Sequence, residues 1–341
     1  MDFIDLGWKF LHGMPPIISW KLLHGIPHAI LNAPLRLGKR PQLPVIKTDF
    51  LGYTLNSPIG IAAGIDKDAS LARVAWLSGA GFHVVGSVLP HKFKGVDPKI
   101  LLRLEEKGTV NRLGLPSPGF TQVLKRIYSI DTPGMPIAVS IAALTFKGFG
   151  DVYREVKHMA SWIELNISCP NVEAHGTFED PDFIPNICTY MKPIDKPVLL
   201  KIPRTLNTKM IKRYVDASLE CGFSGIVAAN TLKVRIRGYN AGYGGPLLFK
   251  STIQMIRIIR SYAPEDFKIV ASGGIDSGAK ALIALNEGAS LVEILSALIN
   301  RGPRALSDII WGLYRALVKR HAQASIKQPR IEINEPASQR L

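Results

Sequence analysis

A cysteine flanked by two asparagines is the strongest sign of chemistry in this sequence. Residues 166–171 read Asn-Ile-Ser-Cys-Pro-Asn, and they follow the apolar run 162–165, which predicts a short buried strand. A thiol between two carboxamides at a strand end is a poor way to build a core. It is a good way to hold a polar planar ligand beside a group that can take a proton, so Cys169 is the first candidate for catalysis.

Other polar or small residues also follow apolar runs. Ala-Ala-Gly-Ile-Asp-Lys ends at Lys67, an ammonium that could meet an anion, although a tight turn with a surface lysine is the simpler alternative. Asn111 opens a Gly/Pro-containing segment, where it could merely cap a turn. Lys201 ends the run Val-Leu-Leu-Lys, and a buried lysine there needs a negative partner, such as an electron-rich ring or an anionic ligand.

Paired glycines mark a candidate phosphate site. Gly273 and Gly274 follow an apolar run and precede a predicted helix, so their backbone N–H groups could cradle a phosphate. Asn230, Thr231 and Ser296 come after neighbouring apolar runs. Each motif is weak by itself, but together they suit a phosphorylated planar cofactor with a small anionic substrate stacked on it. The chain has no Gly-x-Gly-x-x-Gly fingerprint and no His/Cys cluster with metal spacing, so we expect no metal.

Eight apolar runs alternate with helical patterns after residue 47. The predicted strands are 59–63, 83–87, 136–141, 162–165, 198–202, 225–229, 268–271 and 291–295. Helical patterns between them include 208–220, 251–262 and 278–287. Continuous Val/Ile-rich strands alternating with helices predict an α/β fold, a (β/α)8 TIM barrel, in which the site lies at the carboxyl ends of the strands. A doubly wound open sheet is the alternative.

Composition narrows the class of protein. The chain has 341 residues, 47% of them hydrophobic, with a formal charge of +15, which favours anionic partners such as nucleic acid, a lipid surface or a phosphate-bearing cofactor. A solvated basic surface explains the charge equally well. The three cysteines, Cys169, Cys188 and Cys221, are too few and too scattered for a disulfide framework or a zinc site, which favours a reducing compartment.

The first 46 residues differ from the rest. Trp-Lys-Phe-Leu-His-Gly-Met-Pro at 8–15 recurs as Trp-Lys-Leu-Leu-His-Gly-Ile-Pro at 20–27, and no acidic residue occurs between Leu6 and Thr48. Short basic helices that carry Trp are typical of an interfacial membrane anchor, and a helical cap on the main domain is the alternative. We therefore predict a helical extension at 1–46, a barrel at 47–320 and a loose tail at 321–341. We expect no signal peptide and no segment that spans a bilayer.

Five motifs together resemble the dihydroorotate dehydrogenase family, flavin mononucleotide (FMN) enzymes of pyrimidine synthesis. They are Ala-Ala-Gly-Ile-Asp-Lys, Asn-Arg-Leu-Gly-Leu-Pro, Glu-Leu-Asn-Ile-Ser-Cys-Pro-Asn, Ala-Asn-Thr and Ser-Gly-Gly-Ile-Asp-Ser-Gly, within residues 43–320. The resemblance implies that Cys169 is the base that removes a proton from ring carbon 5 of dihydroorotate, while carbon 6 gives a hydride to FMN. It implies substrate contacts from Lys67, Asn111, Asn166, Asn171, Asn230 and Thr231. It implies flavin contacts from Ala63, Gly64, Ser87, Asn166 and Lys201, and phosphate-end contacts from Gly245, Gly273, Gly274, Leu295 and Ser296.

The resemblance is divided between two classes of that family. A Cys base is similar to the soluble class 1 enzymes, whereas the helical extension before 41–44 is similar to the membrane-bound class 2 enzymes, in which it admits a quinone. The expected acceptor is a membrane quinone reached through residues 1–40, and a fumarate-like acid or NAD through a partner subunit is the alternative. We expect a cytoplasmic protein placed peripherally on the inner face of the cell membrane, with no nucleic-acid partner, and we keep a homodimer open. A flavin barrel that reduces uridine in transfer RNA, or a non-catalytic membrane scaffold, fits the chain less well.

Overall fold

Eight parallel strands close into a barrel, as the sequence predicts, and the open-sheet alternative is excluded. The computed structural model describes residues 14, 42–169 and 178–324. In spatial order the barrel strands are β10-β13-β14-β3-β4-β7-β8-β9. Their bounds are β3 (Ile59–Ile61), β4 (His83–Val88), β7 (Ile137–Ile141), β8 (Ile163–Asn166), β9 (Val198–Lys201), β10 (Gly225–Ala228), β13 (Lys268–Ser272) and β14 (Leu291–Ile294). Each lies within two residues of a predicted strand.

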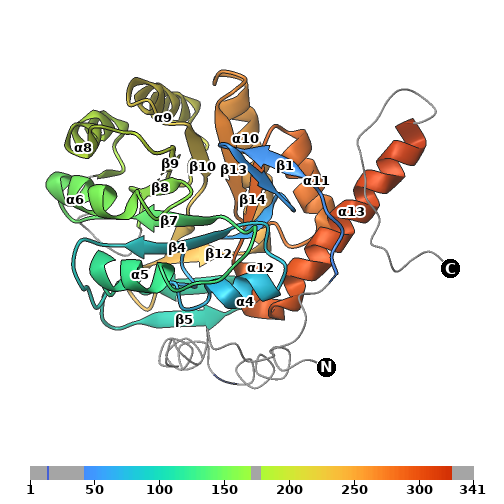
Figure 1. Ribbon diagram of the computed structural model, residues 1–341, viewed down its shortest axis with the longest axis horizontal. Coiled ribbons are helices and arrows are strands. Elements are labelled where there is room, and N and C mark those ends of the chain that lie inside the picture. Colours follow the sequence, from blue (N-terminus) through green and yellow to red (C-terminus); the bar gives the residue numbers. More distant parts are fainter. Residues whose placement is uncertain (1–13, 15–41, 170–177, 325–341) are drawn as a thin grey trace.

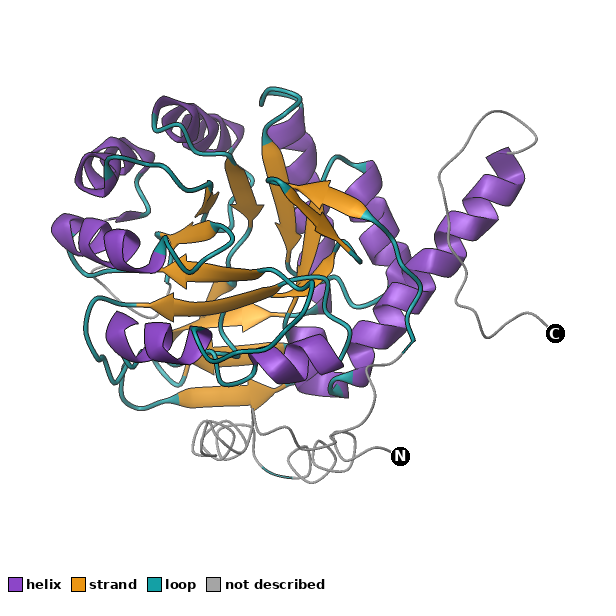
Figure 2. Cartoon of the chain, viewed as in Figure 1, coloured by secondary structure: helices purple, strands orange, loops and turns teal. Residues whose placement is uncertain are grey.

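A helix follows each barrel strand and covers its outer side (Figures 1 and 2). The helices are α4 (Ala72–Leu77), α5 (Phe120–Ile127), α6 (Phe146–Val156), α8 (Ile184–Met191), α9 (Thr208–Glu220), α10 (Phe249–Arg260), α11 (Gly278–Asn286), α12 (Ser296–Arg301) and α13 (Arg304–Ala324). Side-chain caps set three of the starts: Thr145, Asn207 and Ser277 accept hydrogen bonds from the first turns of α6, α9 and α11. The last helix, α13, crosses the predicted boundary at residue 320.

An aromatic plug closes the amino end of the barrel. The hairpin of β1 (Thr48–Phe50) and β2 (Tyr53–Leu55) brings Phe50 and Tyr53 against Trp162, at ring-centroid distances of 5.2 and 6.3 Å. Phe82 packs on the same indole at 5.5 Å, and Trp162 is fully buried. Because this end is filled by side chains, a ligand can enter the barrel only from the opposite end.

A second sheet, which the sequence analysis does not predict, covers part of the carboxyl end. It is antiparallel, in the order β11 (Leu232–Ile236), β12 (Tyr239–Gly244), β6 (Thr109–Arg112) and β5 (Ile100–Arg103). The β5–β6 pair is inserted after β4, and the β11–β12 pair is inserted after β10. Two strand-end insertions therefore join above the barrel mouth and form a wall beside the site.

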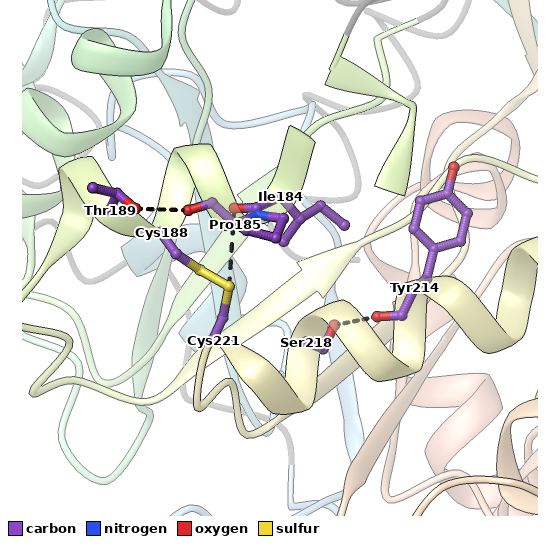
Figure 3. The surroundings of a disulfide bond; sticks show 7 residues. All are labelled: Ile184, Pro185, Cys188, Thr189, Tyr214, Ser218 and Cys221. Atoms are coloured by element: carbon purple, nitrogen blue, oxygen red, sulfur yellow. Dashed lines mark hydrogen bonds between the residues drawn. A yellow bond between two sulfur atoms is a disulfide. The ribbon is translucent and has the colours of Figure 1, made fainter. Parts of the chain in front are cut away.

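A disulfide joins α8 to the end of α9, between Cys188 and Cys221 (Figure 3). The expectation that the cysteines build no disulfide is therefore wrong for this pair. Although 33 residues separate them, consecutive β–α units place α8 beside α9, which brings the two Cα atoms to 5.9 Å.

The predicted extension at 1–46 and tail at 321–341 fall mostly outside the described residues. No helix in the described part of the chain is both long and apolar enough to cross a membrane.

Candidate active site

One cavity of about 320 Å³ opens at the carboxyl ends of the barrel strands, where the sequence predicts the site. All of the predicted phosphate-end residues and several of the predicted ring contacts line it. They are Ala63, Lys201, Asn230, Thr231, Gly245, Gly273, Gly274, Leu295 and Ser296. Gly64 lies beside it, because a Cβ added there would be 3.4 Å from Leu295 Cδ2. The cavity is therefore built from strand ends that are far apart in the sequence.

Hydrogen bonds connect the polar residues of strands β4, β7, β8 and β10. Asn166 Nδ2 donates to Ser87 Oγ at 2.9 Å, and Ser87 Oγ lies 2.9 Å from Ser140 Oγ. Asn230 Nδ2 faces Asn166 Oδ1 at 3.3 Å and Ser168 Oγ at 3.1 Å, and it also donates to the Ser168 carbonyl. These bonds fix the orientation of the two carboxamides, which pre-organises them for a planar polar ligand.

Cys169 keeps its thiol and sits at the edge of this network. It is buried and packs with Leu89, Leu115 and Ala142. Asn171, predicted two residues further on, lies outside the described residues. The surroundings of Cys169 are thus apolar on one side, while the loop that leads to it carries Asn166 and Ser168.

Lys67 is buried, so the alternative of a surface lysine is wrong. Burial lowers the pKa of Lys67 to about 8; nearby Cys169 opposes this shift and the positive charge of Lys201 adds to it. The preceding residue, Asp66, is anchored: its carboxylate lies 2.8 Å from His83 Nε2 and accepts from the Leu71 amide at 3.1 Å. A fixed loop therefore holds the Lys67 ammonium in a poorly solvated position, ready for an anionic partner.

Asn111 lies on β6 and not in a loop, so the alternative of a turn cap is wrong. The strand pairs with β12, and Asn111 Nδ2 donates to the Gly242 carbonyl at 3.2 Å. Thr109, at the start of the same strand, lies 3.0 Å from Ser296 Oγ. The second sheet therefore reaches the mouth of the barrel through residues of β6.

Lys201 contacts two carboxyl groups of the protein itself. The sequence analysis expects a negative partner for this lysine but looks for it in a ligand. Its Nζ lies 3.3 Å from Glu293 Oε2 and 3.6 Å from Glu164 Oε2, and all three side chains are buried. Burial alone would lower the pKa of Lys201, but the attraction of Glu293 and Glu164 raises it. Burial and the neighbouring Glu293 raise the pKa of Glu164 well above its usual range. Glu164 therefore holds a proton more tightly than an exposed glutamate does.

Glycines form the wall at the predicted phosphate end. Gly273 and Gly274 have φ values of +119° and +78°, which L side chains rarely adopt. A Cβ on Gly274 would lie 2.3 Å from the Phe249 amide nitrogen, so a side chain has no room there. Close backbone approach and consecutive amide groups are what a phosphate cradle requires.

The fold and the cavity define a (β/α)8 barrel with a ligand site at the strand ends, and comparison with known proteins gives the family. A family model described as dihydroorotate dehydrogenase matches residues 45–317. The chain is 30% identical over 308 residues to the dihydroorotate dehydrogenase (quinone) of Parvibaculum lavamentivorans (strain DS-1 / DSM 13023 / NCIMB 13966), covering 84% of this chain and 88% of that protein. It is 28% identical to the enzyme of the same name from Sulfurovum sp. (strain NBC37-1), covering 81% and 82%. The chain belongs to the dihydroorotate dehydrogenase family.

A solved structure agrees with the fold. The ligand-free dihydroorotate dehydrogenase of Eimeria tenella superposes with a TM-score of 0.77 at 22% sequence identity, over 92% of this chain and all of that one. At this identity the likeness bears on the fold alone.

Several residues of the site are missed by the sequence analysis. Asp66 stands inside a quoted motif, but its partner His83 is 17 residues away and only the β3–β4 pairing brings it near. Glu164 and Glu293 each interrupt an apolar strand, which is a usable signal, since a carboxylate inside a barrel strand needs a partner. Arg204, three residues after Lys201, carries no such signal.

Proposed function

We propose that this protein oxidises dihydroorotate to orotate in pyrimidine biosynthesis, uses FMN as its cofactor and passes the electrons to a quinone. One observation carries the proposal: the carboxamides of Asn166 and Asn230 are held together at the mouth of a cavity that glycines close at one end. Membership of the dihydroorotate dehydrogenase family supports the reaction, the oxidation of dihydroorotate. The names of the relatives, dihydroorotate dehydrogenase (quinone), support the acceptor.

The cavity suits a flavin with one phosphate. Its volume lies within the usual range for ligand pockets, about 300–1,000 Å³. Ala63 and Gly64 leave room for a flat ring, while Gly245, Gly273, Gly274, Leu295 and Ser296 would surround the phosphate end. Ser87, Asn166 and Lys201 would face the ring. When bound, the flavin supplies the hydride acceptor.

The residues of the chain would do the rest of the chemistry. Lys67 would pair with the substrate carboxylate. The carboxamides of Asn111, Asn166, Asn171 and Asn230 and the hydroxyl of Thr231 would hold the ring. Cys169 would take the proton from carbon 5, and with the hydride lost from carbon 6 the ring gains the double bond of orotate. The apolar contacts of Cys169 with Leu89 and Leu115 would keep bulk water from competing for that proton.

Residues 1–40 would bring the site to the membrane on its inner face and admit the quinone. Their repeated Trp/Lys/His units and the absence of acidic residues after Asp5 favour an anionic lipid surface. A chain that begins at Gln42 should still reduce a soluble dye with dihydroorotate, but it should lose quinone reduction and liposome binding. Full-length protein that ignores anionic liposomes would contradict this part of the proposal.

Steady-state oxidation of dihydroorotate, with a short-chain quinone, fumarate and NAD offered in parallel, tests the reaction and its acceptor together. We expect quinone to support the fastest turnover. Turnover with fumarate or NAD alone would replace the quinone in the proposal. No oxidation with any acceptor, including a dye, would reject the function.

A further inference from the structure

Arg204 lies just behind the glycine end of the cavity, and its guanidinium is held by neutral groups. Its Nε donates to the Asn230 carbonyl at 3.2 Å, and Nη2 donates to the Ser272 carbonyl at 3.0 Å. Nη1 donates to the hydroxyls of Ser251 at 2.9 Å and Thr252 at 3.0 Å. These bonds connect the ends of β10 and β13 to the first turn of α10.

In the part of the chain that the structure describes, the charge of Arg204 has no countercharge. Within the described ranges, 42–169 and 178–324, no carboxylate forms an ion pair with it. Burial lowers the pKa of Arg204 to about 10, and no neighbouring carboxylate opposes this shift. A cation kept from water and surrounded by neutral dipoles is unfavourable until an anion arrives. Among the residues that the structure describes, the positive charge of the Arg204 guanidinium is therefore uncompensated.

The position of Arg204 indicates where an anion that compensates its charge would bind. Nη2 lies against Gly273, since a Cβ added there would be 2.3 Å from it, and Ser272 and Gly273 line the cavity. Two other charged side chains of the cavity lining have ion-pair partners: Arg301 pairs with Asp308, and Asp276 pairs with Lys280. Lys107 also lines the cavity, and within the described residues its ammonium forms no ion pair. An anion in the cavity at Gly273 would face the guanidinium across one layer of backbone, where solvent screens the charge poorly.

We propose that Arg204 is the countercharge for a phosphate monoester bound at Gly273 and Gly274, so that the protein selects a phosphorylated flavin over the same flavin without its phosphate. The inference rests on the proposed function, because it takes FMN as the occupant of the cavity. Arg204 acts here through the cavity wall as a positioning and charge-supplying residue, and it takes no part in the reaction itself.

Ligand exchange on the full-length holoenzyme tests the proposal without measuring activity. Bound FMN is displaced by riboflavin, and flavin fluorescence gives the ratio of the two dissociation constants. Removing the charge in Arg204→Gln should lower the preference for FMN by about tenfold or more, the scale of one poorly solvated interaction with a charged group. Riboflavin affinity should change much less.

Two further variants distinguish the effect of the Arg204 charge from the effect of its hydrogen bonds to the protein. Arg204→Lys keeps the charge but loses the fork of hydrogen bonds, so it should retain most of the preference for FMN even where both affinities fall. Arg260→Gln is the matched control, because Arg260 also donates to backbone carbonyls, those of Pro264 and Gly288 among them, but at the opposite end of α10. It should leave the preference unchanged.

Equal weakening of FMN and riboflavin in Arg204→Gln would overturn the proposal and leave Arg204 as a structural clamp. An unchanged preference would overturn it too, as would an Arg204→Lys variant that folds, binds flavin and yet no longer prefers FMN. Failure of the proposed function looks different, since wild-type protein would then hold no flavin or would hold one that dihydroorotate does not reduce.

Discussion

Replacing Glu164 with glutamine tests whether this side chain is protonated in the folded protein. Lys201 attracts Glu293 across 3.3 Å and Glu164 across 3.6 Å, each with a gross Coulomb energy of about 5 kcal/mol at an effective dielectric constant of 20. One ammonium cannot compensate two buried carboxylates that also repel each other, so the cluster retains a proton. Glutamine copies the shape and neutrality of the protonated acid, and Glu164→Gln should therefore fold normally.

The sign of the pH dependence follows from the raised pKa of Glu164. Above its unfolded pKa, near 4.5, the unfolded chain has lost the proton while the folded chain keeps it. Wild-type stability therefore falls as pH rises, by about 1.4 kcal/mol per pH unit for one retained proton, whereas the variant lacks this loss. From pH 5 to 7 the free energy of unfolding of the variant should therefore rise relative to wild type, by up to about 1.4 kcal/mol per pH unit while the folded wild type keeps its proton.

Urea denaturation at pH 5, 6 and 7 in saturating FMN measures this difference. Glu287→Gln is the control. Its hydrogen bond and ion pair with Arg257 lower the pKa of the half-buried Glu287, so this side chain is largely ionised in both the folded and the unfolded state over this range. The plot of unfolding free energy against pH for Glu287→Gln should run parallel to the plot for wild type. If the Glu164→Gln curve also runs parallel, Glu164 is ionised in the folded protein and the account of the cluster is wrong.

Two other predictions concern the plug and the substrate cation. Trp162→Ala should lower the free energy of unfolding by about 3–5 kcal/mol, because it empties the closed end of the barrel; Tyr128→Ala, at an exposed position, should cost under about 0.5 kcal/mol, and equal costs in the two variants would refute the plug. The lowered pKa of Lys67, about 8, means that the ammonium is charged at pH 7 and largely neutral at pH 9. Values of kcat/KM for dihydroorotate should therefore decline above pH 8, and Lys67→Arg should remove that decline; a decline that persists in Lys67→Arg would assign it to another group.

The barrel could be predicted from sequence because its strands carry their own signal. Continuous apolar runs such as 198–202 and 268–271 read as buried strands without any tertiary information. Many of the predicted site residues line one cavity for the same reason: once the strands are parallel, their carboxyl ends share one face.

The other features of the fold and the site depend on contacts between residues far apart in the sequence, and local sequence patterns do not reveal such contacts. The strand of Asn111, β6, pairs with the nearby β5 and also with β12, whose residues lie more than a hundred positions away. Cys188 and Cys221 meet only because α8 packs beside α9. Of the two carboxyl partners of Lys201, Glu164 lies on the adjacent strand β8, and Glu293 lies on β14, 92 positions away in the sequence. Long-range contacts of this kind decide charge states, and a charge state cannot be assigned from one residue and its neighbours in sequence.

The central claim is that Cys169 takes the proton from dihydroorotate, and anaerobic single-turnover reduction of the bound flavin tests it most directly. Stopped-flow absorbance should show rapid bleaching in wild type. In Cys169→Ala it should be slower by about two to four orders of magnitude, the usual contribution of a general base, with flavin still bound. Bleaching at the wild-type rate in Cys169→Ala would contradict the account.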